Sequence, residues 1–139
     1  MAIKKVTNKS TPEEKEKVVY DLIKLLIKHD MFSDVNIYCN DKRWKSEWDG
    51  PGKPEDKDCY LLKDKNQKTI TPVYVQNDVK VYDYIAFANP NLITMSYEGP
   101  LYDALNYGYK MEKELTKFFE ARGLWFEYGY AWSLSVYEG

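Results

Sequence analysis

The sequence contains few of the residues that build metal and redox sites. It has two cysteines, Cys39 and Cys59, and one histidine, His29. The cysteines lie far apart without CxxC spacing, and with a single histidine they cannot supply the four ligands of a structural zinc site. We therefore expect no metal and no cofactor. Because intracellular thiols stay reduced, two reduced, partly buried cysteines are favoured over a disulfide.

Long apolar runs and a strong charge of one sign are also missing. No run approaches the ~18 residues of a membrane-spanning helix, and the basic first twelve residues are not followed by the apolar stretch of a secretory signal. These features predict a cytoplasmic protein with no membrane partner. With 20 basic and 22 acidic residues, the net charge is −2. This balance argues against a nucleic-acid partner bound through a broad basic face.

Common catalytic motifs are absent as well: the chain has no GxSxG, HExxH, P-loop or GxGxxG pattern. His29 ends a predicted helix, where a histidine usually just complements the helix dipole. One weak catalytic candidate is Asp83. The strand register predicted below places it opposite Tyr97 on an apolar face, where loss of water would favour a neutral acid. The alternative is a structural carboxylate that reaches water or accepts a hydrogen bond from Tyr97.

The composition favours one globular domain over the whole chain, 1–139. At 139 residues, 44% hydrophobic and 30% charged, there is room for a single core. We expect residues 1–10 to form a flexible N-terminal arm. The polar, Pro- and Gly-rich residues 49–58 are expected to form an exposed loop.

Two helices are predicted. Thr11, Pro12 and Glu14 form a capping box with proline in the first turn, and an apolar stripe continues to about His29. A second helix begins at Gly99-Pro100. It ends at Gly123, and its expected core stripe is Leu101, Leu105, Gly108, Met111, Leu115 and Phe118.

Three hairpins are predicted between the helices. Residues 34–39 and 42–48 alternate around Asn40-Asp41, a pair that tolerates the positive φ of a tight turn. That loop places Ile37 opposite Trp44 and Tyr38 opposite Arg43. Residues 59–63 and 68–76 are predicted to form a second hairpin, whose register the sequence does not determine. The third pairs 79–88 with 92–98, with Phe87 opposite Ile93, Ile85 opposite Met95 and Asp83 opposite Tyr97.

The last segment, 124–137, alternates almost perfectly and is predicted to be a strand with either a bend at Gly129 or a projecting end. The fold class is therefore α+β, an antiparallel sheet built from hairpins with two helices packed on it, in the order α-β-β-β-β-β-β-α-β. The C-terminal strand could pair with its own copy in a homodimer.

Aromatic residues are the one clear excess. The chain has 13 tyrosines, 4 tryptophans and 5 phenylalanines, more than one small core easily encloses. Tyrosine is enriched at recognition surfaces because it offers a large contact area and a polar tip. An alternative is that helices cover both sheet faces and bury these rings. The candidate binding residues are Tyr38, Arg43, Tyr82, Tyr84, Tyr97, Tyr102, Tyr107 and Tyr109.

The sequence thus favours a small, non-catalytic protein that binds another protein through a tyrosine-rich, mildly acidic surface. By size, charge and aromatic content it has the general character of an inhibitor or immunity-type antagonist. The alternative is a small-ligand or nucleotide pocket between the sheet and the second helix, with Tyr97 stacking on the ligand. Nucleic acid could also stack on the basic, aromatic segment 42–48, although core packing explains Trp44 and Trp48 more simply. A carboxylate-based enzyme using Asp83 is a weaker possibility.

Overall fold

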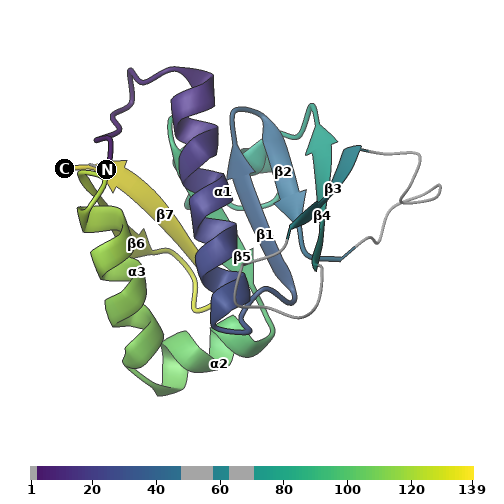
Figure 1. The fold of residues 1–139 in the computed structure, drawn as a ribbon, viewed down its shortest axis with the longest axis vertical. Helices are drawn as coiled ribbons and strands as arrows, with labels where there is room; N and C mark the ends of the chain where they lie inside the picture. The colour runs from purple at the N-terminus through teal and green to yellow at the C-terminus, as the bar shows by residue number, and fades with distance from the viewer. Residues whose placement is uncertain (1–2, 48–57, 63–70) are drawn as a thin grey trace.

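A computed structural model describes residues 3–47, 58–62 and 71–139, with 58–62 described by the backbone alone. It contains three α-helices, a short 3-10 turn and seven strands (Figure 1). The helices are α1 (Pro12–Lys28), α2 (Pro100–Tyr107) and α3 (Lys110–Glu120), and the 3-10 turn is η2 (Val81–Asp83). The strands are β1 (Val35–Cys39), β2 (Lys42–Lys45), β3 (Asp58–Leu62), β4 (Thr71–Asn77), β5 (Ile93–Tyr97), β6 (Leu124–Tyr128) and β7 (Ser133–Glu138).

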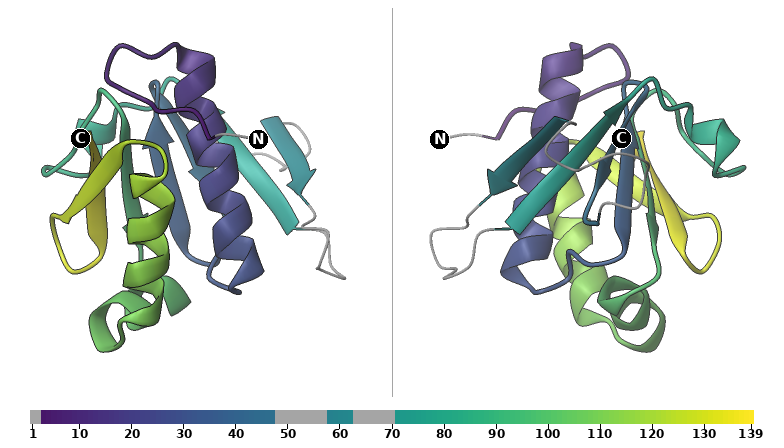
Figure 2. Two further views of the ribbon diagram at one scale, coloured as in Figure 1. Left: turned by 60° about the vertical axis from the view of Figure 1, so that its left-hand side comes forward. Right: turned by 90° about the vertical axis from the view of Figure 1, so that its right-hand side faces the viewer.

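All seven strands belong to one antiparallel sheet in the order β3-β4-β2-β1-β5-β7-β6. The helices α1 and α3 lie side by side on one face of this sheet, and η2 lies on the other face (Figure 2). The predicted α+β class with an antiparallel sheet is confirmed. Among the described residues, no helix is long and apolar enough to cross a membrane.

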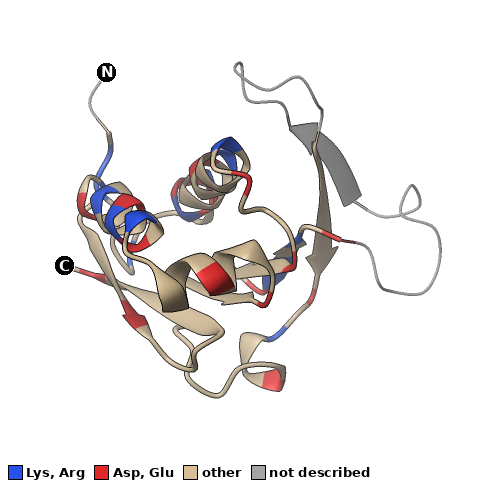
Figure 3. Cartoon of the chain, turned by 90° about the horizontal axis from the view of Figure 1, so that it is seen from below, with Lys and Arg blue, Asp and Glu red and all other residues tan. Residues whose placement is uncertain are grey.

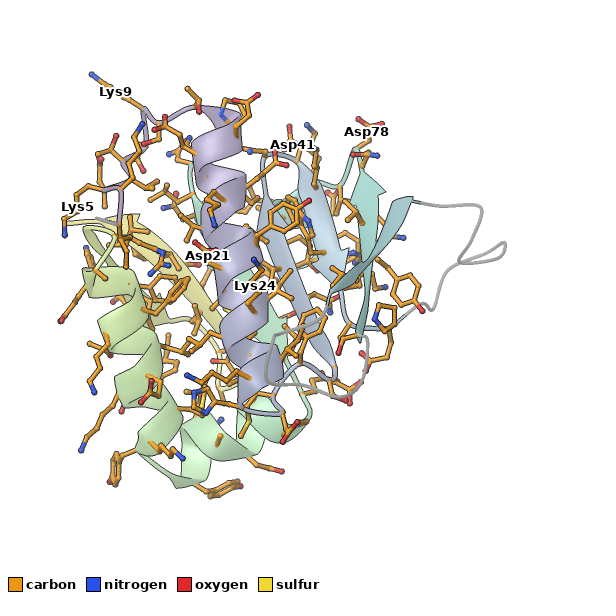
Figure 4. All side chains as sticks on the ribbon, in the orientation of Figure 1. Lys5, Lys9, Asp21, Lys24, Asp41 and Asp78 are labelled. Carbon is orange, nitrogen blue, oxygen red and sulfur yellow. The ribbon has the colours of Figure 1, made fainter. Side chains whose placement is uncertain are left out.

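The main hydrophobic core lies between the sheet and the helices. Alternate residues of β1, β2, β5 and β7 point into it, so that Ile37, Trp44 and Met95 are almost fully buried. An ion pair joins α1 to the turn that follows α3: Arg122 Nη2 lies 3.3 Å from Asp21 Oδ2. Figure 4 shows Asp21 on the side of α1 that faces α3.

Helix α1 begins at the predicted capping box. Thr11 Oγ1 accepts a hydrogen bond from the Glu14 amide at 3.2 Å, and Glu14 Oε1 accepts one from the Thr11 amide at 2.9 Å. Lys4 lies beside this carboxylate. Its hydrogen bond, together with that of Thr11, lowers the pKa of Glu14 to about 2.

Within the segment 1–10, predicted to be a flexible arm, the described residues Val6 and Asn8 contact the body of the protein. Val6 is buried, and its amide donates to the Arg122 carbonyl oxygen at 2.9 Å. The Asn8 side chain donates to the Glu138 carboxylate at 2.9 Å. The apolar Val6 side chain explains this attachment, because leaving it in water would cost free energy.

The first predicted hairpin is confirmed in its register and its turn. Ile37 pairs with Trp44, and Tyr38 pairs with Arg43. The turn residues Asn40 and Asp41 have φ of 53° and 58°, the left-handed values that a two-residue hairpin loop requires. The predicted position of Trp48 lies outside the described residues.

The second predicted hairpin corresponds to β3 and β4, whose register pairs Tyr60 with Val73. Strand β3 begins at Asp58, one residue inside the segment predicted to be a loop. The rest of that loop prediction, 49–57, lies outside the described residues, and so does the predicted connection 64–67.

The third predicted hairpin is wrong. Residues 79–88 form no strand; they contain η2 and an irregular stretch. Strand β5 pairs instead with β1 and β7, so Ile93 faces Val136 and Tyr97 faces Val35. The alternation of apolar and polar residues alone favoured a strand here. The buried residues Val81 and Ile85 are instead four residues apart, the spacing of a helical turn, and the Ile85 amide donates to the Val81 carbonyl.

The second predicted helix is divided into α2 and α3 at Gly108. This glycine is extended, with φ −153° and ψ 179°, and therefore interrupts the helical hydrogen bonds. In α3, Phe119 points into the core in place of the predicted Phe118, and its side chain is fully buried. Gly123 has a φ of 75° and follows α3, as expected for a C-terminal glycine.

The predicted C-terminal strand is two strands joined by a reversal at Gly129. Strands β6 and β7 pair antiparallel, with Phe126 opposite Val136. The Gly129 amide donates to the Ser133 carbonyl at 3.1 Å and closes the connection. The predicted bend is therefore present, but the strand turns back on itself. Strand β7 lies between β5 and β6, so within the predicted C-terminal strand only the β6 part lies at an edge of the sheet, and pairing with a second copy stays a prediction.

Candidate functional site

The sheet face opposite the helices, here called the open face, differs in chemistry from the core face. Its central side chains are small and polar, because alternate residues of β5 and β7 point to this side. Thr94 and Ser135 are buried there and share a hydrogen bond of 3.1 Å between their hydroxyl groups. In Figure 3 the helices carry many charged residues, whereas the strands carry few apart from β2, which contains Lys42, Arg43 and Lys45. The open face therefore presents polar strands whose charged side chains include Arg43 and Lys45 of β2.

The segment 79–92 crosses the open face and is anchored by Asn89. The Asn89 side chain is 8% exposed and donates to the Val136 carbonyl at 2.7 Å. Its backbone amide donates to Thr94 Oγ1 at 2.8 Å. A small second core forms beneath the segment from Val81, Ile85 and Tyr38. These contacts fix the aromatic side chains that the segment carries.

A cluster of aromatic rings lies on this face. Tyr130 stacks on Trp132 with ring centroids 4.7 Å apart and contacts Phe87 at 5.1 Å. Trp132 in turn packs against the small core that contains Tyr38, and Tyr38 lies 5.9 Å from Tyr84. We call this group the open-face cluster, consisting of Tyr38, Arg43, Tyr84, Phe87, Tyr130 and Trp132.

Arg43 completes the cluster as its fixed cation. Its guanidinium carbon lies 4.5 Å from the ring centre of Tyr84 and 5.8 Å from that of Tyr38. Arg43 Nε donates to Gln76 Oε1 at 2.8 Å, which holds the planar group in place. A guanidinium held flat against a ring needs little further ordering when a ligand binds.

A hollow of about 250 Å³ adjoins the open-face cluster at Trp132. Its lining includes the polar side chains of Asn36, Lys45 and Ser96, and the Lys45 side chain is almost fully buried. The carboxylates of Asp34, Glu47 and Glu98 also line it. The hollow thus combines three acidic groups, one lysine and an aromatic wall.

Of the predicted site residues, some lie on this surface and others do not. Tyr82 and Tyr84 are exposed, at 59% and 54%, as expected for the outer side of their segment. Arg43 lies beside Tyr84. Tyr107 and Tyr109 are also exposed, but they lie at the junction of α2 and α3, at the opposite end of the molecule from η2 (Figure 2). The exposed tyrosines therefore do not form one patch.

Three predicted tyrosines are not openly exposed. Tyr38 is 5% exposed because Tyr84 and the segment 79–92 cover it, so its expected exposure is wrong. Tyr97 is fully buried on the core face. Tyr97 belongs to the main core together with Leu101 of α2, so its ring has no exposed face for the predicted stacking. Tyr102 is partly buried and packs against the main core.

Sequence reasoning missed Phe87, Tyr130 and Trp132. Phe87 was predicted to be a core residue of a strand, and the other two were assigned to the apolar face of a continuous C-terminal strand. Phe87 is instead 59% exposed. The signal that could have found Tyr130 and Trp132 is Gly129, since a reversal there places the following aromatic residues in a connection rather than in a strand.

The structure does not contain the setting that was predicted for the catalytic candidate Asp83. Asp83 is exposed on η2. Tyr97 pairs with Val35 and not with Asp83, so the predicted apolar setting of Asp83 is wrong. Cys39 carries a free thiol, and burial raises its pKa to about 12, which keeps it protonated and unreactive at neutral pH. Among the described residues, no group of three His, Cys, Asp or Glu side chains could hold a metal ion.

Comparison with protein-family models, with curated proteins and with solved structures finds no match to this chain. The functional argument therefore rests on the geometry of the open face.

Proposed function

We propose that this chain is a non-catalytic binding protein whose open-face cluster contacts another protein. One observation carries the proposal: Tyr84, Phe87 and Tyr130 are 54%, 59% and 38% exposed, and their ring partners Tyr38 and Trp132 share the same small second core. Large apolar rings in contact with water are unfavourable unless a partner covers them. Tyrosine, tryptophan and arginine are also the residues that contribute most to protein–protein binding energy.

The shape of the surface favours a protein over a small molecule. Small-ligand sites are concave and enclose most of the ligand surface. The exposed rings of the open-face cluster stand on the surface instead, and a hollow of about 250 Å³ lies beside them. A partner side chain fits that hollow while the surrounding partner surface covers the rings. Because Asp34, Glu47 and Glu98 line the hollow, a basic side chain is the favoured occupant.

The proposed mode of action is occlusion in the cytoplasm, as an inhibitor or immunity-type antagonist acts. The aromatic cluster would cover ~800 Å² of the partner, the usual size for one side of a stable interface. The acidic hollow would orient the partner during approach and would do so less effectively at high salt. No bond is made or broken in this mechanism, in keeping with a cluster made of rings and one arginine.

The test compares tyrosines of the same chemistry in two places. The unaltered chain, Tyr84→Ala and Tyr107→Ala are each used as bait in a lysate of the source organism, and the captured protein is then purified for affinity measurements. Tyr84 belongs to the open-face cluster, whereas Tyr107 is 80% exposed at the junction of α2 and α3. We expect Tyr84→Ala to weaken binding by about 30-fold, or ~2 kcal/mol, and Tyr107→Ala to have little effect.

A second variant, Phe87→Ala, extends the test to another member of the open-face cluster and should weaken binding in the same way. The proposal is wrong if the captured protein binds Tyr84→Ala and Phe87→Ala as tightly as the unaltered chain. It is also wrong if Tyr107→Ala alone abolishes capture, because the interface would then lie at the helices.

A further inference from the structure

Strand β6 forms an outer edge of the sheet. It pairs with β7 on one side, and the sheet order ends with it on the other. Figure 2 shows β6 at the margin of the sheet, with α3 in front of the neighbouring strands. A strand in this position offers one row of backbone hydrogen-bonding groups to any second strand that reaches it.

The register of the β6–β7 pair identifies these groups. The Gly129 amide donates to the Ser133 carbonyl, and the Gly139 amide donates to the Gly123 carbonyl. In an antiparallel pair, hydrogen-bonded positions alternate along each strand. The backbone groups of Trp125 and Glu127 therefore point to β7, whereas those of Leu124, Phe126 and Tyr128 point away from it. The outer edge offers three N–H donors and three carbonyl acceptors.

This edge has few of the features that usually prevent pairing between strands. Protein edges are commonly guarded by lysine, proline or a bulge. Strand β6 reads Leu-Trp-Phe-Glu-Tyr, with one charge, and its pairing with β7 is regular over all five residues. Trp125 and Tyr128 are 47% and 40% exposed. The edge is therefore regular and aromatic, and it can pair with a second strand.

The order of side chains in β6 makes it complementary to itself. We propose that β6 pairs antiparallel with β6 of a second copy of this chain, about a two-fold axis at Phe126. In this register Phe126 faces Phe126 of the other copy, and Leu124 faces Tyr128 of the other copy. Trp125 faces Glu127 of the other copy. All five residues overlap, all six outward backbone groups of each copy are paired, and no two like charges of the strands face each other.

The dimer places both open faces on the same side. A two-fold axis perpendicular to the joined sheets keeps the helices of both copies on one face and both open-face clusters on the other. A five-residue strand covers less area than the ~1,200 Å² typical of stable complexes, so the dimer forms at high concentration and dissociates on dilution. Two clusters on one side would bind a repeated or dimeric partner with increased avidity.

The first test measures mass and hydrogen exchange on the purified chain alone. Light scattering should give 16.4 kDa in dilute solution and approach twice that mass as the concentration rises. Over the same range, the amides of Leu124, Phe126 and Tyr128 should become protected. Those of Trp125 and Glu127 serve as internal controls, because their bonds to β7 protect them at both concentrations.

The second test uses two variants that differ in the sign of one charge. Trp125→Glu places a glutamate opposite Glu127 of the other copy, whereas Trp125→Lys places a lysine there. Both variants lose the stacking of Trp125 on Tyr137, whose ring centroids are 5.0 Å apart, and the hydrogen bond from Trp125 Nε1 to the Glu138 carbonyl, so they share these losses in the monomer. We expect Trp125→Glu to raise the dissociation constant of the dimer at least tenfold relative to Trp125→Lys.

The proposal is overturned if the mass stays at 16.4 kDa and the three outward amides exchange equally fast at all concentrations. It is also overturned if a dimer forms but the two variants dissociate alike, because the contact would then lie elsewhere. Protection of these amides by a captured protein, without a dimer, would assign the edge to that protein. If a variant fails to fold, hydrogen exchange on the unaltered chain decides. None of these outcomes depends on the partner bound by the open-face cluster.

Discussion

Tyrosine occupies three distinct environments in this protein. Tyr97 lies in the core and is fully buried, Tyr128 donates from its hydroxyl to Glu112 at 3.0 Å, and Tyr84 stacks on Arg43 in contact with water. The same side chain therefore fills space, anchors a helix to a strand, or forms a recognition surface. Its neighbours in space decide which.

Tyr97 supports a prediction about stability. Its hydroxyl oxygen is buried and has no hydrogen-bond partner among the described residues, and burial is the main cause that raises its pKa. A buried, unpaired hydroxyl loses its bonds to water without compensation. Tyr97→Phe keeps the ring and removes the hydroxyl, so it should stabilise the protein by about 1 kcal/mol in urea unfolding.

Tyr128→Phe is the matched control for this prediction. It removes a hydroxyl that does have a partner, Glu112, and should lower the free energy of unfolding by about 0.5–1 kcal/mol. A loss of stability in Tyr97→Phe as large as that in Tyr128→Phe would show that the Tyr97 hydroxyl has a partner after all.

At the scale of elements, glycines set where helices end, but by two different means. Gly123 follows α3 with a φ of 75°, a conformation that other residues rarely adopt. Gly108 separates α2 from α3 in an extended conformation that any residue can adopt. A side chain at Gly108 would come no closer than 3.4 Å to the Ala104 carbonyl oxygen, an ordinary contact. The positive φ of Gly123 therefore requires glycine, whereas the extended backbone of Gly108 does not.

This difference predicts opposite effects of the same substitution. Gly123→Ala should lower the free energy of unfolding by about 1–2 kcal/mol, because alanine is strained at positive φ. Gly108→Ala should leave stability unchanged or raise it by up to ~1 kcal/mol, since alanine can adopt the extended conformation of this residue and reduces the entropy of the unfolded chain. Thermal unfolding of both variants checks the prediction. Equal destabilisation would mean that the extended backbone at Gly108 also requires glycine.

At the scale of the whole molecule, the two faces of the sheet have different tasks. The helices cover the core face, and residues such as Leu22, Trp44 and Leu134 are almost completely buried there. The open face is covered in part by the segment 79–92, which brings its own aromatic residues to the surface. Asn89 joins this segment to the sheet. The position of the open-face cluster therefore depends in part on this buried amide side chain, alongside the Ser135 hydroxyl, which donates to the Phe87 carbonyl at 3.1 Å.

Replacing that side chain should loosen the segment. Asn89→Ala leaves the Val136 carbonyl oxygen without its donor and should lower the free energy of unfolding by about 1–3 kcal/mol. It should also speed hydrogen exchange at the Ile85 amide, which donates to the Val81 carbonyl. Asn91→Ala, two residues away and exposed, is the control and should change neither quantity. Unchanged exchange at Ile85 in Asn89→Ala would contradict the anchoring role.

Part of the functional surface could be predicted from the sequence. The excess of aromatic residues indicated that some rings are exposed, and Tyr82 and Tyr84 are. Phe87, Tyr130 and Trp132 could not be assigned to the same surface, because they join it through a connection and a strand reversal distant in sequence. Tyr38 was misplaced for the same reason: its cover comes from the segment 79–92.

The sequence by itself determined the features that depend on neighbouring residues. The capping box of α1 and the hairpin turn at Asn40-Asp41 are set by bonds and dihedral angles within a few residues, so their local signals were sufficient. The tertiary structure decided which strands pair. Strand β5 lies between β1 and β7 rather than beside residues 79–88, because burying the apolar faces of distant strands together outweighs pairing with the nearest segment.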